Sequence, residues 1–395
     1  MAKMFKGRRI IFGLMIFALT TSFSAGFLVS REALLADLIS CEFRFGARVQ
    51  EPSKPYSYGE QEVSYLNQID NVTISGTLTF PYEKEKFPVV ILVGGYGKID
   101  RDATTLGHRY FLVLADYLTR QGIGVLRFDK RGVGKSTGNF KTATSIDLAR
   151  DVSAGIDFLK TQKNIDVQNI GLIGHSEGGL VSAIVCSERK DIAFAVLLAP
   201  ALAITLEDIV YHAGRQLRFE GASEHFIERD ASIRKMLHLV AKQEYNPEKT
   251  IEKMRLLLEC YFKNLSAADK EEMEHLSLAF TPLASEFWMR LIASRAIYFF
   301  MHYDVSKMLR KIKNPLLLLY GSKDGIASVD RAQSVIECGL KEGGNTDYTV
   351  VELAGHNHYF QRAQTGALKE YGDIEETISF KALETIFSWI KVHVK

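Results

Sequence analysis

The stretch Gly174-His175-Ser176-Glu177-Gly178 reads G-x-S-x-G, which predicts a sharp turn between a strand and a helix. The apolar run 169–173 before it predicts a buried strand, and the apolar run 179–186 after it predicts a packed helix. A strand, a tight turn and a helix place Ser176 at the apex of a strained bend, where glycine neighbours avoid collisions of a Cβ atom. The first amides of the helix point at the same space and can stabilise an oxyanion. The stretch therefore predicts a nucleophilic Ser176 rather than a structural serine in an ordinary βα turn.

Strands and helices alternate along the chain on both sides of this stretch. Two segments with alternating apolar residues, 63–66 and 72–78, predict an antiparallel hairpin. The later predicted strands are 89–93, 123–128, 169–173, 193–198, 316–320 and 348–353. The predicted helices are 106–120, 145–160, 179–186, 329–340 and 374–393. This alternation predicts an α/β fold, a mostly parallel, doubly wound sheet with helices on both faces.

The alternation stops between two of these strands, where residues 201–312 carry helical patterning and many charges. An insertion there covers the carboxyl ends of the strands, where α/β sheets bind ligands, so we interpret it as a cap. The alternative is a helical subdomain without a substrate role. The predicted organisation is an N-terminal targeting segment (1–30), a linker (31–60), a first core part (61–200), the helical cap (201–312) and a second core part (313–395).

The N-terminus has the pattern of an export signal. Basic residues open the chain, an apolar core runs from Ile10 to Leu19, and small residues follow. The alternative is an uncleaved anchor, because the stretch from Ile10 to Val29 is just long enough to span a bilayer. We therefore expect an exported protein, periplasmic or extracellular, whose only membrane contact is through this segment.

Composition excludes several classes of function. The 395 residues include 49 basic and 47 acidic ones, and this balance gives no reason to expect a nucleic-acid partner. The four cysteines lie far apart without a C-x-x-C pair, which argues against a zinc ribbon and a disulfide framework.

A serine nucleophile needs a base, and the base needs an orienting acid. Asp324 lies four residues after the strand 316–320, close enough to reach the catalytic edge of the sheet; Asp330 and Asp304 are weaker alternatives. His356 and His358 both follow the last strand, and spacing alone does not separate them. A metal-binding His-x-His pair is a further alternative, but no matching ligand cluster is evident in the sequence.

The glycine-rich loop Gly94-Gly95-Tyr96-Gly97 follows the predicted strand 89–93. We expect the amides of Gly95 and Glu177 to form the oxyanion hole; the alternative is a flexible glycine turn. A second glycine-rich loop, 131–136, ends in G-K-S like a phosphate-binding loop. Asp129 stands where that motif requires glycine, which argues against nucleotide binding.

Four segments carry a resemblance to a known family: 112–122, 127–136, 170–179 and 357–361. They resemble the bacterial α/β-hydrolase family of EstD-type esterases, which is often classified together with serine aminopeptidases and prolyl-oligopeptidase-like hydrolases. The family's closing motif is usually Pro-Gly-x-Asn-His, which implies that His358 is the base and that His356 occupies the variable position. This chain departs from the pattern at Ala354, and Gly325-Ile326-Ala327 replaces a stretch that often carries a proline.

Together the motifs predict a serine hydrolase that acts by acyl transfer, with catalytic residues Ser176, His358 and Asp324 and no metal or organic cofactor. The resemblance implies carboxylic esters, with short to medium acyl chains, as the small-molecule substrates. A serine peptidase on the same residues and a non-catalytic binding protein are the alternatives. Aromatic residues of the insertion are candidates for an acyl pocket, although at helical spacing they also suit a core: Phe287, Trp288, Tyr298, Phe299 and Phe300. The oligomeric state is not readable from the sequence.

Overall fold

The computed structural model describes residues 48–82, 84–202, 205–276, 279–282 and 284–394. The predicted targeting segment 1–30 lies outside these residues. The framework is an eight-stranded sheet with the order β1-β2-β6-β3-β7-β8-β9-β10. Its strands are β1 (Gly59–Asn67), β2 (Val72–Phe80), β3 (Phe87–Val93), β6 (Gly124–Phe128), β7 (Ile165–His175), β8 (Phe194–Leu198), β9 (Leu316–Gly321) and β10 (Tyr348–Leu353). Strand β2 pairs antiparallel with both β1 and β6. The strands from β6 to β10 in this order pair parallel with their neighbours.

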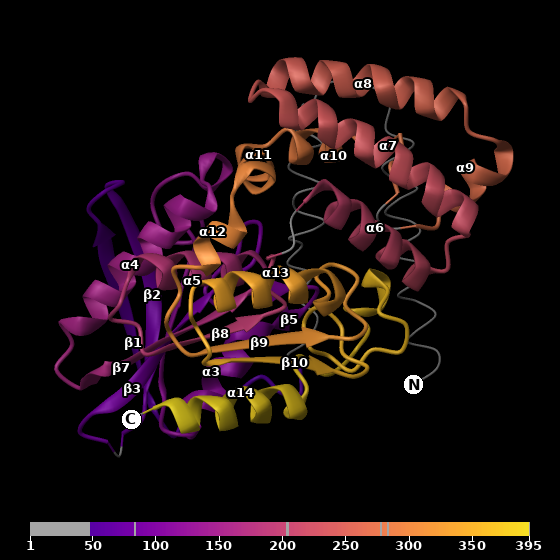
Figure 1. Cartoon of the computed structure of the whole chain (residues 1–395). Coiled ribbons are helices and arrows are strands. Elements are labelled where there is room, and N and C mark those ends of the chain that lie inside the picture. Colours follow the sequence, from indigo (N-terminus) through magenta and orange to yellow (C-terminus); the bar gives the residue numbers. More distant parts are fainter. Residues whose placement is uncertain (1–47, 83, 203–204, 277–278, 283, 395) are drawn as a thin grey trace, which may run out of the picture. The chain divides into compact units, whose positions relative to one another are not determined.

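Helices cover both faces of the sheet, because the central strands are buried on both sides (Figure 1). One face packs against α4 (Ser145–Lys160), α5 (Glu177–Glu188), α12 (Val305–Leu309) and α13 (Val329–Glu342). The other face packs against α3 (Tyr110–Arg120) and α14 (Phe380–His393). The predicted fold class, a mostly parallel sheet of the α/β-hydrolase type, is confirmed.

Two helices begin later than their apolar patterns predict. The short strands β4 (Thr104–Thr105) and β5 (His108–Arg109) form a hairpin whose turn holds Leu106 and Gly107 at positive φ, so α3 begins at Tyr110. The hydroxyl of Ser379 accepts a hydrogen bond from the Ala382 amide and caps α14, which begins at Phe380 instead of residue 374.

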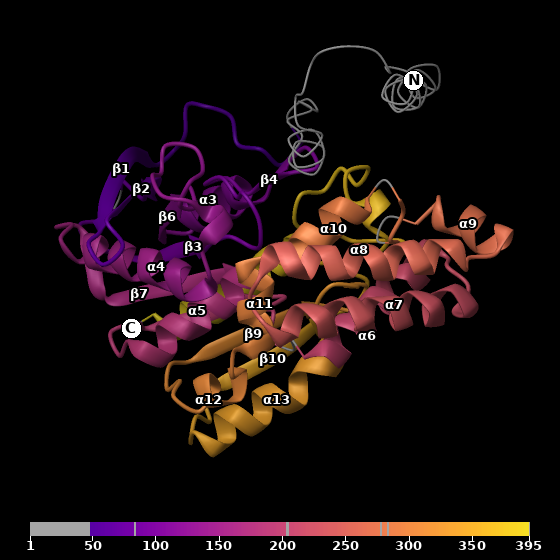
Figure 2. The same cartoon turned by 90° about the horizontal axis from the view of Figure 1, so that it is seen from above.

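The segment between β8 and β9 is helical. Its elements are α6 (Leu206–Glu220), α7 (Glu224–Gln243), α8 (Pro247–Lys263), α9 (Ala267–Met273), α10 (Ser285–Ile292) and α11 (Arg295–His302), followed by α12. Figure 2 shows α7 and α8 lying side by side. Helices α6 to α10 have apolar clusters of their own, separate from those of the sheet, whereas α12 packs in the core of the sheet. The insertion therefore has its own small core, and α6 joins it to the loops at the end of the sheet.

Part of the predicted linker is bonded to the sheet domain. The Arg48 guanidinium donates to the carbonyls of Gly107 and Gly372, and the Gln50 side chain donates to the Ile378 carbonyl. Residues 59 and 60 already belong to β1. The chain from residue 48 onward is thus anchored to the C-terminal loop before the first strand begins.

Candidate active site

The bend between β7 and α5 carries Ser176 in a strained conformation, with φ 56° and ψ −117°. Its amide donates to the Leu198 carbonyl at 2.8 Å, which ties the bend to the neighbouring strand. A Cβ atom at Gly174 would overlap the Gly178 carbonyl, and one at Gly178 would overlap the Val93 carbonyl. Glycine is therefore required on both sides of the serine, as the spacing of the motif implies.

Asp324 and His358 meet in the loops that follow β9 and β10. Asp324 is fully buried, and its Oδ2 lies 2.7 Å from Nδ1 of His358. Its other oxygen accepts hydrogen bonds from the amides of Ile326 and Ala327 at 2.7 and 3.0 Å. A carboxylate only accepts hydrogen bonds, so His358 carries its proton on Nδ1 and leaves Nε2 as the basic nitrogen. The pair thus has the tautomer that a general base needs.

The other candidates for base and acid have different partners. The ring of His356 lies between the Ala354 carbonyl, 2.9 Å from Nδ1, and the Ser379 hydroxyl, 2.8 Å from Nε2. Asp330 forms an ion pair with Arg215, and Asp304 caps the start of α12. The structure therefore brings Asp324 together with His358 and leaves the alternatives elsewhere.

Sequence reasoning missed His175, which precedes the candidate nucleophile. Its Nε2 lies 2.9 Å from the His358 carbonyl oxygen, and the two rings are 4.7 Å apart between centroids. Burial lowers the pKa of His175 to about 3, so the ring is neutral at pH 7 and Nε2 donates this hydrogen bond to the carbonyl. His175 thereby holds the backbone of His358. No sequence signal marks this role, because any residue type satisfies x in G-x-S-x-G.

No hydrogen bond among the described residues joins the Ser176 hydroxyl to His358. Such bonds are commonly long in unliganded enzymes, and a rotation about the serine χ1 moves the oxygen without moving the backbone. Ser176 and the Asp324–His358 pair therefore lie in neighbouring loops of one sheet edge, with His175 joining the two.

The glycine loop after β3 packs over Ser176. A Cβ atom at Gly95 would lie 3.3 Å from the Ser176 Cβ. Within the part of the chain that the structure describes, nothing accepts a hydrogen bond from the amides of Gly95, Tyr96 or Glu177. Glu177 is the first residue of α5, so its amide also benefits from the positive end of the helix dipole. Unpaired donors thus lie on two sides of the nucleophile.

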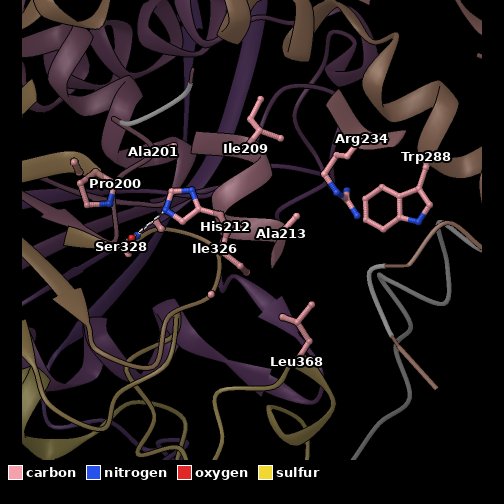
Figure 3. Close-up of a pocket in the computed structure, with 13 residues that line it drawn as sticks. Pro200, Ala201, Ile209, His212, Ala213, Arg234, Trp288, Ile326, Ser328 and Leu368 are labelled. Atoms are coloured by element: carbon pink, nitrogen blue, oxygen red, sulfur yellow. Dashed lines mark hydrogen bonds between the residues drawn. The ribbon is translucent and has the colours of Figure 1, made fainter. Parts of the chain in front are cut away.

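A cavity of about 340 Å³ lies beside these loops, between the insertion and the sheet (Figure 3). Pro200 and Ala201, which follow β8, form part of its wall, and the Ala201 amide donates to the Ser176 carbonyl at 3.1 Å. Residues 325–328, directly after Asp324, form another part, and Trp288 comes from α10 of the insertion. Of the five aromatic candidates, only Trp288 lines this cavity, while Phe299 and Phe300 pack against the core of the sheet.

The glycine-rich loop 131–136 is occupied by a side chain of the protein itself. The carboxylate of Asp129 accepts hydrogen bonds from the amides of Arg101 and Lys135, at 2.9 and 3.3 Å. Within this loop, the Lys135 amide is thus taken by an anion of the protein, and the amides of Gly132, Val133 and Ser136 bond to backbone carbonyls, so they are not free for a phosphate. Among the described residues, no group of three or more Cys, His, Asp or Glu side chains is placed to hold a metal ion.

A strained serine elbow, a buried Asp–His pair and unpaired amides at one edge of this sheet define the class of α/β hydrolases. A family model described as serine aminopeptidase, S33, matches residues 104–246. Esterase EstD of Thermotoga maritima is 26% identical over 197 residues, which is 50% of this chain and 44% of that protein, so the match spans less than half of the relative's length.

Solved structures agree on the fold. Esterase Pf2001 of Pyrococcus furiosus aligns with a TM-score of 0.51 at 19% identity, over 86% of this chain and 92% of that one. The α/β hydrolase GrgF from Penicillium aligns with a TM-score of 0.51 at 16% identity, over 85% and 99%. The resemblance to the family of EstD-type esterases and serine aminopeptidases is confirmed.

Proposed function

We propose that this protein is a serine hydrolase that cleaves carboxylic esters through an acyl-enzyme. The observation that carries the proposal is the 2.7 Å contact between Asp324 Oδ2 and His358 Nδ1, in loops adjoining the strained Ser176 elbow. The match to an esterase supports the choice of esters.

In the proposed reaction, His358 Nε2 takes the Ser176 proton while the serine oxygen attacks the ester carbonyl. The imidazolium that forms is stabilised by Asp324 and returns the proton to the departing alcohol. Water then attacks the acyl-enzyme with His358 again as base. Two backbone amides stabilise the oxyanion in both steps: the amide of Glu177, and a second from the Gly95 loop.

The cavity beside Ala201 is the proposed acyl site, with the helical insertion acting as a cap over it. Its lining is largely apolar, and Trp288 offers a flat surface for a short or medium acyl chain. The volume of about 340 Å³ lies at the small end of the range for small-molecule sites.

A peptidase with the same triad is the second candidate, and the description of the matching family model favours it. An aminopeptidase needs a negative group to hold the substrate's amino terminus. None of the described residues that line the cavity is an Asp or a Glu, and the two charged or titratable side chains there are Arg234 and His212. This lining favours an ester with an uncharged acyl group.

The export signal predicted in residues 1–30 supports a periplasmic or extracellular location, by secretion or by an N-terminal anchor. Among the described residues, no helix is long and apolar enough to cross a bilayer. Fractionation of cells expressing the full chain tests the proposal, and recovery of the protein in the cytosol alone would contradict it.

The decisive experiment measures hydrolysis of p-nitrophenyl esters of increasing acyl length. Ser176→Ala and His358→Ala should each lower kcat by on the order of 10⁶-fold, the loss observed when a serine protease loses its nucleophile or base. His356→Ala is the matched control and should retain kcat within about tenfold, because its ring contacts Ala354 and Ser379. Turnover of aminoacyl amides but not esters would favour the peptidase, and turnover of neither would favour a binding protein.

A further inference from the structure

Lys130 is a buried lysine in the loop after β6, and only 4% of it is exposed. Its ammonium donates to the Gly95 carbonyl at 2.7 Å and to Oε2 of Glu177 at 3.1 Å. The other carboxylate oxygen of Glu177 accepts from the Ser145 hydroxyl at 3.0 Å. A buried ion pair is a poor source of stability, because desolvation of the two charges offsets their attraction. The contacts of Lys130 therefore point to a role other than stability.

The two partners of Lys130 belong to the two segments that flank the candidate nucleophile. Glu177 directly follows Ser176 and opens α5, and Gly95 packs against Ser176 from the loop after β3. One ammonium thus ties together the two segments that carry the unpaired amides.

The hydrogen bond to Gly95 fixes the orientation of one peptide unit. In a trans peptide the carbonyl and the amide hydrogen point in opposite directions. The Gly95 carbonyl faces Lys130, so the amide of the same unit, which belongs to Tyr96, faces away from the Lys130–Glu177 pair. Glycine allows rotations of the adjoining peptide that other residues resist, so this loop needs an external group to hold one orientation.

The residues on either side of Lys130 form hydrogen bonds with other segments. Asp129 binds Arg101 and the Lys135 amide, and Arg131 binds Asp151 and Asp70. Lys130 is thus the member of this charged run that contacts the Ser176 region. Its neighbour Arg131, which is similarly buried and ion-paired, provides a matched control.

We propose that Lys130 is a positioning residue that holds the Gly95–Tyr96 peptide so that the Tyr96 amide, together with the Glu177 amide, receives the oxyanion. The proposal rests on the proposed serine-hydrolase function. It replaces the Gly95 amide, which the sequence suggested as the donor, with the amide of the next residue.

The test neutralises the ion pair in the double variant Lys130→Met/Glu177→Gln, because Lys130→Met alone leaves a buried unpaired carboxylate. We expect kcat for p-nitrophenyl butyrate to fall on the order of 100-fold, as when an oxyanion donor is lost, with KM changed by less than about threefold. Binding of a trifluoromethyl ketone, which forms a tetrahedral adduct with the serine, should weaken by a similar factor.

The control variant Arg131→Met/Asp151→Asn removes an ion pair of similar burial and should keep kcat within about threefold, even if its melting temperature falls as far. Equal losses of kcat in the two double variants would overturn the proposal, because both would then report stability alone.

A crystal structure of the Lys130→Met/Glu177→Gln variant decides the point independently of turnover. A rotated or disordered Gly95–Tyr96 peptide supports the proposal, and an unchanged one overturns it. If the unmutated protein hydrolyses neither esters nor amides, the proposed function fails, while this peptide orientation still shows whether Lys130 holds the loop.

Discussion

Single buried histidines make the stability of this protein depend on pH. His238 in α7 is buried, its Nδ1 lies 2.8 Å from the Arg234 carbonyl, and burial lowers its pKa to about 4. An unfolded histidine has a pKa near 6.5, so between these values the unfolded chain binds a proton that the folded chain does not. Stability from the neutral ring is therefore complete above about pH 6.5 and decreases as the pH falls toward 4.

We expect His238 to lower the free energy of unfolding by about 2 kcal/mol between pH 7 and pH 5. Urea unfolding at the two pH values measures this, with His238→Gln as the variant that no longer titrates. The variant should lose less stability on acidification than the unmutated protein. The other buried histidines, such as His175 and His108, remain in both proteins and contribute equally. An identical pH dependence in the two proteins would contradict this expectation, because it would mean that His238 binds its proton equally well in the folded and the unfolded chain.

At the scale of elements, helix α6 of the insertion supports the loop that carries Asp324. The Arg215 guanidinium donates to the carbonyls of Asp324 and Ser322 at 3.0 and 2.7 Å. His212, one turn earlier, accepts a hydrogen bond from the Ser328 amide at 3.1 Å. The acid loop is thus held by a helix outside the sheet, so the insertion positions the proposed catalytic acid as well as enclosing the cavity.

Arg215→Met should release this loop and lower kcat by about tenfold to a hundredfold, because small misplacements of catalytic groups have large effects on rate. Steady-state kinetics with a p-nitrophenyl ester measures it, with KM expected to stay close to that of the unmutated protein. Arg331→Met is the control, since Arg331 joins α13 to Asp208 of α6 without contacting the acid loop. A loss of kcat of the same size in both variants would indicate that general docking of α6 matters rather than the contact with Asp324.

For the whole molecule, the packing of the insertion on the sheet decides the size of the proposed acyl site. Trp288 reaches the cavity from α10, while its neighbour Phe287 does not line it, although their rings lie 5.3 Å apart. The two side chains therefore separate the effect of the cavity wall from the effect of packing inside the insertion.

Trp288→Ala should enlarge the site and shift the ratio of kcat/KM for long over short acyl esters upward by about tenfold, the scale on which apolar pockets discriminate. The same series of p-nitrophenyl esters measures the shift. Phe287→Ala should leave the ratio within about twofold of the unmutated value. An unchanged ratio in Trp288→Ala would place the acyl chain elsewhere.

The sequence alone determined the features that depend on local spacing and on chain order. Apolar runs of strand length, broken by turns, predicted the parallel sheet, and the glycines around Ser176 predicted an elbow in which a Cβ atom has no room. The sequence placed the helix starts 106 and 374 too early. The pattern of apolar residues alone does not reveal a hairpin turn at Leu106 or a serine cap at residue 379.

Contacts between segments far apart in the chain follow from the tertiary structure and not from the sequence pattern. Asp324 and His358 are 34 residues apart, and spacing treats His356 and His358 alike, yet the path of the loop after β10 turns one ring to Asp324 and the other to Ser379. Lys130 lies 47 residues before its partner Glu177, so no sequence motif predicts that contact. Such contacts depend on how separate loops converge at one edge of the sheet, which a pattern of neighbouring residues does not encode.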